Sequence, residues 1–379
     1  MSVLIVGGGI AAHECAFELR RQGFDGDVRV LSAETAPPYD RTWVSKGLIT
    51  GQRQPDDAIL SSADSFSDAD IRLELDTRAV GLDVGRREVL LERSSPIPFE
   101  RLVICSGGEP VLPAALGAPG VLTIRELSDA SRLRSTLEAA DDLAVIGAGF
   151  IGGEIASAAA ALGKEVTLIE AASAPLAHLL GDEVAARIRA LHVDAGVDVR
   201  CGVAVSELHH RNGGFSLRLA DGGSVGAAAV VAGVGMRPAT EWLEGTPVEL
   251  QDGVLTDSRG QTSVPGVFAA GDCARWWSAR HGAPLRIEHW DTAARHGAAV
   301  ASSALGRETS FDLVPFHWSE QHGVMHQWVG HAPTWDRVEV DDVDPPRAYV
   351  ARYFVGDRLV GVFAAGQPKA IARARRELA

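Results

Sequence analysis

The sequence is poor in cysteine, and its cysteines form no recognisable pair. Its 379 residues include only Cys15, Cys105, Cys201 and Cys273, with no CxxC, CxxxxC or zinc-type spacing. A disulfide reductase relays electrons through two neighbouring thiols, so that class of enzyme is excluded. Unpaired cysteines are typical of a reducing compartment, and we expect a cytoplasmic location.

Long apolar runs and an excess of positive charge are also lacking. No apolar run reaches the roughly 18–20 residues of a membrane span, and the first residues form no basic n-region with a cleavage site, so neither membrane insertion nor export is expected. The 36 basic and 50 acidic side chains give a formal net charge of −14, which argues against a nucleic-acid binder. This does not argue against an acidic protein partner, because docking depends on local patches of charge.

Two histidines have a spacing that metal sites use. His322 and His326 form a His-x3-His pair, but no third ligand is evident nearby in the sequence. We therefore expect these histidines on the polar surface of the last domain, and we predict no metal site.

The most informative features present are two glycine-rich segments, 140 residues apart. Val3–Ala12 reads VLIVGGGIAA and Leu143–Gly152 reads LAVIGAGFIG. Each is an apolar strand that runs into a glycine turn and a helix of small residues. Glycines let the backbone approach a pyrophosphate, which then lies at the positive N-terminus of the helix. The pair predicts two bound dinucleotides in two domains of a globular chain, with electrons passing between them.

The first glycine turn is followed by the rest of a nucleotide-binding unit. Apolar spacing predicts a helix over 11–22 and a strand over 28–31. Glu34 follows, 22 residues beyond Ala12, at a distance typical of a carboxylate that accepts a ribose hydroxyl.

The second turn repeats this order. Its helix stops at Gly163, and a strand over 166–169 leads to Glu170. Residues 171–173 are Ala, Ala and Ser, with no Arg or Lys to receive a 2′-phosphate. A carboxylate repels that phosphate and accepts bonds from a bare ribose, so NADH is favoured over NADPH.

Two further apolar strands end in glycine turns, RLVICSGG at 101–108 and VPGVFAAGD at 264–272. Each is explained either as a turn after a core strand or, for the second, as a carboxylate, Asp272, placed to hold a sugar-like chain with Gly271 clearing space. Composition alone does not choose between these explanations.

Several other segments complete a series of motifs. They read PYDRTWVSK at 38–46, GFIGGE at 149–154, GVGMRP at 233–238, RIEHW at 286–290 and VPFHWSEQ at 314–321. Taken in order with the glycine turns, they resemble the flavoproteins with two dinucleotide-binding domains, in particular the NADH-dependent ferredoxin reductases of oxygenase and cytochrome P450 systems. That family's corresponding segments include PYDRPPLSK, GFIGLE and VPWFWSDQ, and the resemblance covers essentially the whole chain.

The resemblance implies an α/β fold with two Rossmann-like domains of glutathione-reductase type, for FAD and NAD, and a C-terminal α+β domain. The expected boundaries are 1–113 with 236–309 for a discontinuous FAD-binding domain and 114–235 for the NADH-binding domain. Residues 310–379 are expected to form a domain that caps the flavin.

The resemblance also implies noncovalent FAD at the first turn and NADH at the second. The residues expected to contact FAD are Gly7, Gly9, Ala12, Glu34, Arg41, Lys46, Ser106, Gly107, Gly271, Asp272, Trp290 and Trp318. The residues expected to bind NADH are Gly147, Gly149, Ile151, Gly152, Glu170 and Gly235.

Three residues are expected to take part in catalysis. The resemblance implies that Lys46 and Glu154 pair and place positive charge near the flavin N5, and that Trp318 lies near the ring. Without the resemblance, Glu154 is explained as a first-turn acid that satisfies a helix dipole, and Lys46 as a solvated loop charge.

The sequence departs from the family pattern at several residues; among them, Cys105 and Ser106 stand where the family has Ala and Thr. Thr42 and Trp43 replace two prolines, Val111 replaces an arginine, and Gly153 replaces the leucine of GFIGLE. These departures bear on the shape of the loop beside the flavin and on the partner, and they leave FAD binding expected.

The implied activity is that of an NADH:ferredoxin oxidoreductase, an enzyme in which FAD accepts a hydride from NADH and passes single electrons to a [2Fe–2S] ferredoxin. Arg373 and Arg376 share one face of a C-terminal helix and are expected to contribute a basic docking patch, although a solvated terminal helix explains them equally well. Two alternatives stay open at this point: an NADH oxidase or diaphorase with another acceptor, and a slow-turnover redox sensor that binds FAD and NADH.

Overall fold

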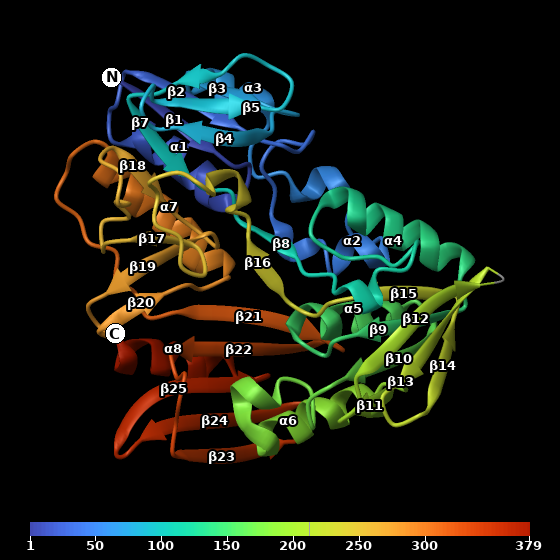
Figure 1. The fold of residues 1–379 in the computed structure, drawn as a ribbon. Helices are drawn as coiled ribbons and strands as arrows, with labels where there is room; N and C mark the ends of the chain where they lie inside the picture. The colour runs from blue at the N-terminus through green and yellow to red at the C-terminus, as the bar shows by residue number, and fades with distance from the viewer. Residues whose placement is uncertain (212) are drawn as a thin grey trace. The chain divides into compact units, whose positions relative to one another are not determined.

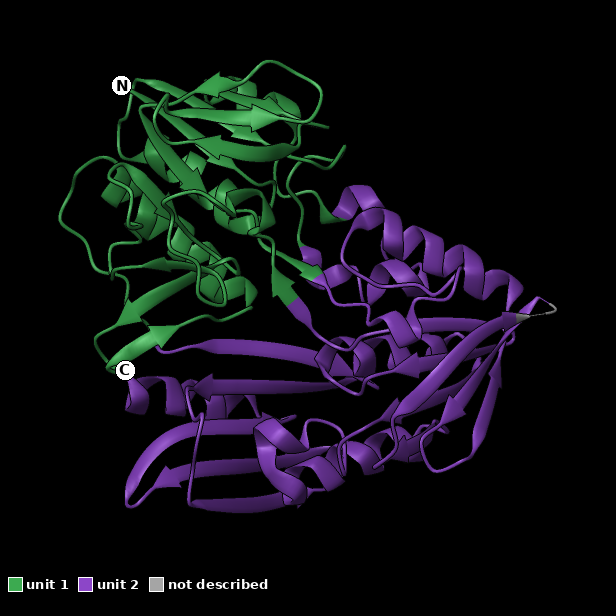
Figure 2. Cartoon of the chain, in the orientation of Figure 1, with its two compact units in different colours: residues 1–40, 58–109, 237–313 green, residues 41–57, 110–236, 314–379 purple. Residues whose placement is uncertain are grey.

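The computed structural model describes residues 1–211 and 213–379, which divide into two compact units (Figure 2). Unit 1 comprises Met1–Asp40, Ala58–Glu109 and Arg237–Leu313, and unit 2 comprises Arg41–Asp57, Pro110–Met236 and Val314–Ala379. The three-domain boundaries expected from the sequence stay a prediction.

Unit 1 is built around a five-stranded parallel sheet in the order β18-β7-β1-β2-β3 (Figure 1). These strands are β1 (Ser2–Val6), β2 (Asp27–Leu31), β3 (Ile71–Glu74), β7 (Arg101–Ile104) and β18 (Val267–Ala269). The central strand β1 is an apolar run whose last four residues are buried, as expected for a parallel strand covered on both faces. The predicted strand over 28–31 is confirmed as β2.

Helix α1 (Ile10–Arg21) packs closely against α7 (Trp290–Ala304) in this unit. The helices approach closely because Gly297 has no side chain: a Cβ there would lie 2.1 Å from the carbonyl oxygen of Ala11. The buried face of α1 includes Cys15 and Leu19, which lie in the same core as the parallel sheet. The predicted helix over 11–22 is therefore confirmed, one residue earlier in the chain.

Smaller elements complete unit 1. They are α3 (Ala63–Asp68), a sheet of β4 (Ala79–Asp83), β5 (Glu88–Leu91) and β6 (Ile97–Pro98), and a sheet of β17 (Val254–Thr256), β19 (Ala274–Ser278) and β20 (Ala283–Leu285). Two short strands at the boundaries of the units, β8 (Gly108–Pro110) and β16 (Met236–Pro238), pair with each other.

Unit 2 contains a second parallel sheet, in the order β11-β10-β9-β15. These strands are β9 (Asp142–Ile146), β10 (Glu165–Glu170), β11 (Asp198–Cys201) and β15 (Ala229–Ala232). The helices of this part are α2 (Gly47–Thr50), α4 (Leu127–Ala139), α5 (Phe150–Ala161) and α6 (Ala177–Asp194), and an antiparallel sheet is formed by β12 (Val205–Arg211), β13 (Gly214–Leu219) and β14 (Ser224–Ala227).

The last part of unit 2 is a five-stranded antiparallel sheet in the order β21-β22-β25-β24-β23 (Figure 1). Its elements are β21 (Phe316–Gln321), β22 (Val324–Gly330), β23 (Arg337–Asp344), β24 (Ala348–Val355), β25 (Arg358–Ala365) and the terminal helix α8 (Pro368–Leu378). Helix α6 shares a hydrophobic core with this sheet, and the hydroxyl of Tyr353 donates to the carbonyl oxygen of Leu180, 2.8 Å away. This packing brings the end of α6 beside β21.

Two parallel sheets with helices and a C-terminal α+β part confirm the predicted fold class. Among the described residues, no helix is long and apolar enough to cross a membrane.

Candidate dinucleotide and catalytic sites

The first glycine turn joins β1 to α1 in unit 1. Gly7 has a φ of +130°, and a Cβ there would lie 2.0 Å from the carbonyl oxygen of Cys105, so only glycine fits. Gly9 is the N-cap of α1, and within the described chain no side chain caps this helix. The backbone N–H groups of the first turn, including that of Ala12, are thus left for a ligand, which fits a pyrophosphate.

The acidic residue expected at the ribose is held by a buried tyrosine. Glu34 follows β2, and its Oε2 accepts a 2.6 Å hydrogen bond from the hydroxyl of Tyr39, which is 1% exposed. This bond orients the half-buried carboxylate and leaves it able to accept further bonds, as a ribose contact requires.

Two other strands deliver predicted residues to the same edge of the sheet. Strand β7 leads to Ser106 and Gly107, and the Ser106 hydroxyl donates to the carbonyl oxygen of Ala239 at 2.7 Å. Strand β18 leads to Gly271 and Asp272. Because carboxyl ends of parallel strands meet at one edge, these residues and the first glycine turn lie at the edge where such sheets bind ligands.

Gly271 is held by a histidine that the sequence analysis missed. Its φ is +78°, a Cβ there would lie 2.9 Å from the Cβ of Ala11, and its N–H donates to Nδ1 of His296 at 3.3 Å. His296 is fully buried and stacks on Phe311, and burial lowers the pKa of His296 to about 3. Trp290, another expected FAD residue, is the half-buried first residue of α7.

The second glycine turn joins β9 to α5 in unit 2. A Cβ on Gly147 would lie 2.3 Å from the carbonyl oxygen of Gly233, and one on Gly152 would lie 1.9 Å from the carbonyl oxygen of Gly147. Gly149 is the N-cap of α5, which likewise has no side-chain cap in the described part of the chain. Ile151 is 44% exposed in the first turn of the helix. The backbone there fits a second pyrophosphate.

Glu170 does more than the sequence predicts. Its Oε2 accepts the N–H of Ala148 at 2.7 Å, inside the glycine turn, and its Oε1 accepts the N–H of Ala172 at 2.8 Å. The carboxylate therefore fixes the glycine turn to the loop after β10. Gly235, also predicted for this site, is exposed, has a φ of +119° and accepts the N–H of Val111 through its carbonyl.

The expected pairing of Lys46 with Glu154 is confirmed. The Lys46 ammonium lies 2.9 Å from Oε2 of Glu154 and donates to the carbonyl oxygen of Thr42 at 2.8 Å. Glu154 is 3% exposed and also accepts the hydroxyls of Ser45 and Ser319, the latter at 2.6 Å. A buried carboxylate needs such partners, so the pair is neither a solvated loop charge nor an exposed first-turn acid.

Two residues predicted near the flavin, Arg41 and Trp318, also lie in unit 2. Arg41 donates to the carbonyl oxygen of Arg125 at 3.1 Å, and Trp318, in β21, stacks on Phe316. Trp43, one of the departures from the family pattern, carries the guanidinium of Arg53 over its ring at 4.4 Å.

The expectation that His322 and His326 lie on the polar surface is wrong for His326 and only partly right for His322. His326 is 2% exposed and its ring stacks on Phe363, while His322 is half-buried. Burial lowers the pKa of each ring to about 4. Across residues 1–211 and 213–379, no group of three or more His, Cys, Asp or Glu side chains is arranged to hold a metal ion.

Sequence reasoning also missed the side chains that support Glu154. Ser45, Ser319, Gln321 and His192 are all buried, at 2% exposure or less. Ser45 and Ser319 reach Glu154 from 109 and 165 residues away in the chain. Only the segments PYDRTWVSK and VPFHWSEQ, which contain three of the four, point to them.

Two family models together match most of the chain. Residues 1–297 match the pyridine nucleotide-disulphide oxidoreductase model, and residues 316–379 match the reductase C-terminal model. The ferredoxin–NAD(+) reductase component of the p-cumate 2,3-dioxygenase system of Pseudomonas putida is 36% identical over 376 residues, covering 99% of this chain and 92% of that protein. Putidaredoxin reductase CamA of Pseudomonas putida is 30% identical, covering 97% of this chain and 89% of that protein.

Solved structures agree with this relationship. The covalent putidaredoxin reductase–putidaredoxin complex contains a chain with a TM-score of 0.95 and 29% identity, covering 100% of this chain and 92% of that one. The ferredoxin reductase for the CYP199A2 system of Rhodopseudomonas palustris has a TM-score of 0.92 and 29% identity, covering 96% of this chain and 91% of that one. The chain therefore belongs to the pyridine nucleotide-disulphide oxidoreductase family and ends in a reductase C-terminal domain.

Proposed function

We propose that this protein is an FAD-containing NADH:ferredoxin reductase. The relative named as the ferredoxin–NAD(+) reductase component of the p-cumate 2,3-dioxygenase system aligns over 99% of this chain, glycine turns and C-terminal domain included. FAD supplies the conversion of a two-electron hydride from NADH into single electrons.

The free, buried cysteines indicate what kind of electron acceptor the protein uses. All four are free, and Cys105 and Cys273 are buried. Burial raises the pKa of both thiols, which keeps them protonated and unreactive. Although the family is named for disulphide chemistry, this protein has no pair of cysteines that could relay electrons. Its electrons leave to an external acceptor, for which a ferredoxin is the proposal.

Each dinucleotide has its own set of residues in this proposal. Gly7, Gly9 and Ala12 hold the FAD pyrophosphate at the N-terminus of α1, with Glu34 at the adenosine ribose. The other FAD contacts we assign are Arg41, Lys46, Ser106, Gly107, Gly271, Asp272, Trp290 and Trp318.

NADH is assigned to the turn before α5. The residues are Gly147, Gly149, Ile151, Gly152, Glu170 and Gly235. Glu170 selects NADH over NADPH because its carboxylate repels a 2′-phosphate, and residues 171–173 supply no basic side chain.

Lys46, Glu154 and Trp318 are the catalytic residues we assign. The Lys46 ammonium contributes positive charge where the flavin becomes reduced, and Glu154 holds that ammonium in place at 2.9 Å. Phe150 and His317 contact each other edge to face at the start of α5, with ring centroids 4.7 Å apart.

The partner we propose is a [2Fe–2S] ferredoxin that docks on a basic patch of α8. Arg373 and Arg376 are exposed on that helix, and Lys369 is exposed in its first turn. Ferredoxins are typically acidic, so these charges steer association. We also infer a cytoplasmic location, since the cysteines are unpaired.

Charge reversal tests this patch. The double variant Arg373→Glu/Arg376→Glu is expected to lower kcat/KM for ferredoxin about 10-fold or more at low salt, with a smaller loss at high salt. The variant Arg86→Glu/Arg93→Glu reverses two exposed arginines in unit 1 and is the control, because it changes the net charge by the same amount. An equal effect of the two double variants contradicts docking on α8.

Stopped-flow absorbance tests the function itself. The yellow protein is mixed anaerobically with NADH or NADPH and then with a [2Fe–2S] ferredoxin. Fast bleaching by NADH followed by reoxidation as the ferredoxin is reduced supports the proposal. Bleaching without transfer favours an oxidase or diaphorase, a long-lived reduced complex with NAD⁺ favours a redox sensor, and a colourless protein refutes FAD binding.

A further inference from the structure

A continuous chain of side-chain hydrogen bonds runs through unit 2 and ends on Glu154. The His322 Nε2 lies 2.8 Å from the His192 Nδ1, and the His192 Nε2 lies 2.9 Å from the Gln321 Oε1. The Gln321 Nε2 lies 3.1 Å from the Ser319 hydroxyl, which lies 2.6 Å from the Glu154 Oε1. Helix α6, strand β21 and helix α5 each contribute to it, so the fold assembles this chain from three separate parts of the sequence.

The donor and acceptor groups of these side chains orient all four hydrogen bonds in one direction. Glu154 accepts the Ser319 hydroxyl, so the serine oxygen in turn accepts the Gln321 amide N–H. The carbonyl of Gln321 then accepts the N–H of His192 Nε2, and the other nitrogen of that ring accepts the N–H of His322 Nε2. Every donor therefore points toward Glu154.

This arrangement requires both rings to be neutral. Burial lowers the pKa of His192 to about 3 and that of His322 to about 4, with neighbouring positive charge adding to each shift. Both rings are therefore neutral near pH 7, and a proton on the second nitrogen of His192 does not compete with the donor from His322.

The space that Gln321 occupies exists because residue 153 is glycine. A Cβ on Gly153 would lie 2.6 Å from the Gln321 Oε1 and 2.8 Å from both Cδ and Nε2. Glycine is unfavourable inside a helix, and the family pattern has leucine at this position, next to Glu154. In this structure a leucine at residue 153 would displace the Gln321 amide from its present place.

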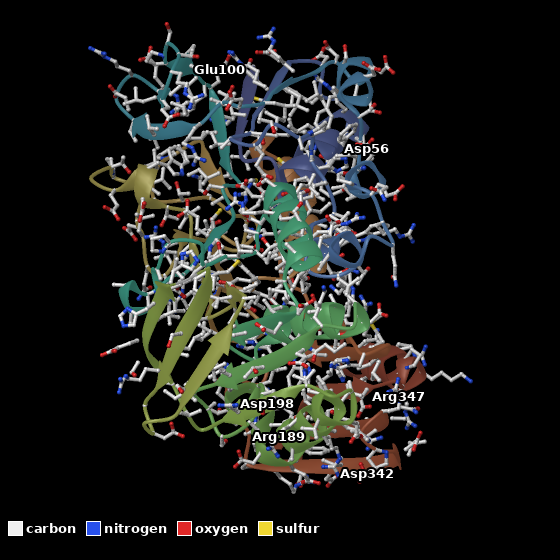
Figure 3. All side chains as sticks on the ribbon, turned by 90° about the vertical axis from the view of Figure 1, so that its right-hand side faces the viewer. Asp56, Glu100, Arg189, Asp198, Asp342 and Arg347 are labelled. Carbon is white, nitrogen blue, oxygen red and sulfur yellow. The ribbon has the colours of Figure 1, made fainter. Side chains whose placement is uncertain are left out.

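The far end of the chain is anchored as firmly as the near end. His322 lies in the tight turn between β21 and β22, and its backbone φ of +50° is one that residues other than glycine rarely adopt. Its N–H donates to the Ser157 hydroxyl oxygen at 2.7 Å, and its carbonyl accepts the guanidinium of Arg347 at 3.0 Å. Arg347, labelled in Figure 3, lies in the turn between β23 and β24. These bonds fix the ring that begins the chain.

We propose that Gln321, His192 and His322 are positioning residues, which through Ser319 hold the Glu154 carboxylate against Lys46. This inference rests on the proposed function, in which the Lys46–Glu154 pair assists hydride transfer. The series of hydrogen bonds from His322 to Glu154 is, however, testable without the proposed function.

The first test is a double-mutant cycle on flavin reduction by NADH, with the FAD-loaded protein in stopped flow. Gln321→Ala and Gly153→Leu are each expected to slow the limiting rate about three- to tenfold, as loss of one buried hydrogen bond predicts, with the apparent Kd for NADH within twofold. The double variant is expected to be no slower than Gln321→Ala, because the leucine then occupies space already vacated. Ala161→Leu, at the exposed end of the same helix, is the control.

The outcomes of the cycle are distinct. Additive losses in the double variant, or single-variant rates within twofold of wild type, overturn the inference. Gly153→Ala, whose Cβ meets only the movable end of Gln321, replaces the leucine variant if that protein fails to fold. Failure of NADH to reduce the wild-type flavin refutes the proposed function instead.

The second test reads the chain directly. NMR of the protein with 15N-labelled histidine is expected to show both His192 and His322 protonated only at Nε2 at pH 7, with the Nε2–H resonance of His192 shifted in Gln321→Ala because its acceptor is lost. Protonation of His192 at Nδ1, or an Nε2–H resonance of His192 that is unchanged in Gln321→Ala, contradicts the proposed hydrogen-bond arrangement, whether or not the protein reduces ferredoxin.

Discussion

The clearest prediction concerns the charge that remains when Lys46 is replaced by methionine. The two charges lie 2.9 Å apart, which corresponds to an attraction of about 6 kcal/mol at an effective dielectric constant of about 20, before desolvation. Glu154 is 3% exposed and keeps two hydroxyl donors in the variant. Breaking a buried pair from one side costs about 3–5 kcal/mol, and the remaining hydroxyls place Lys46→Met near the lower end, about 3 kcal/mol.

Removing the other partner is expected to cost less. In Glu154→Gln the ammonium of Lys46, whose side chain is 23% exposed, turns to water and keeps the carbonyl of Thr42. We expect a loss of about 1 kcal/mol for Glu154→Gln, a typical value for one hydrogen bond. The double variant is expected to lie close to it, because no buried charge is then left unpaired.

Thermal unfolding of the FAD-loaded variants, followed by circular dichroism, measures these differences. For a cooperative unit of roughly 150–250 residues about 1 kcal/mol shifts Tm by about 2–4 °C, so Lys46→Met is expected to lose about 6–12 °C and Glu154→Gln about 2–4 °C. The same Lys46→Met protein is expected to retain FAD and to be reduced by NADH more slowly. A Tm for Lys46→Met equal to that of the double variant would refute the reasoning, and an unaltered single-turnover rate would remove Lys46 from the mechanism.

The other predictions concern the second dinucleotide site, the first glycine turn and acid stability. Glu170→Ala is expected to raise the Kd for NADH about 10- to 100-fold, as loss of hydrogen bonds to a charged group predicts, with the limiting rate of flavin reduction within twofold; an unchanged Kd in a binding titration rejects the ribose role. Gly7→Ala places a Cβ 2.0 Å from the Cys105 carbonyl oxygen and is expected to yield protein without bound FAD, so a yellow variant with wild-type FAD content contradicts it. The pKa of His296 is about 3 in the folded protein, whereas an unfolded histidine takes up its proton near pH 6.5, so its contribution to stability is present above about pH 6.5 and is lost below it by about 1.4 kcal/mol per pH unit. Urea unfolding at pH 7 and pH 5 is expected to show a smaller loss for His296→Phe than for wild type, and equal losses contradict this assignment.

Local features of the nucleotide sites were predictable because their physics is local. The glycine turns at Gly7 and Gly147, the helices that follow them, and the strands leading to Glu34 and Glu170 are each set by a few consecutive residues. Backbone freedom, apolar spacing and strand propensity act over such short distances. The structure therefore has these elements within a few residues of the predicted bounds.

Pairings between distant residues were only partly predictable. The family pattern points to Lys46 and Glu154, but no local signal shows that Ser45 and Ser319 reach the same carboxylate. The burial of His326 was missed for a similar reason: its place is set by the pairing of β22 with β25, which no local signal shows. Tertiary contacts decide such cases, and one sequence contains them only implicitly.

Gly153 was partly predictable, because its identity is visible in the sequence but its contact is with a distant residue. The sequence shows that the position departs from the family pattern, and helix propensity shows that glycine there is unfavourable. Neither observation says what the glycine is for, because Gln321 approaches from a strand 168 residues later in the chain. Once that approach is known, the glycine is explained by packing in this chain, because a larger side chain there would displace the Gln321 amide.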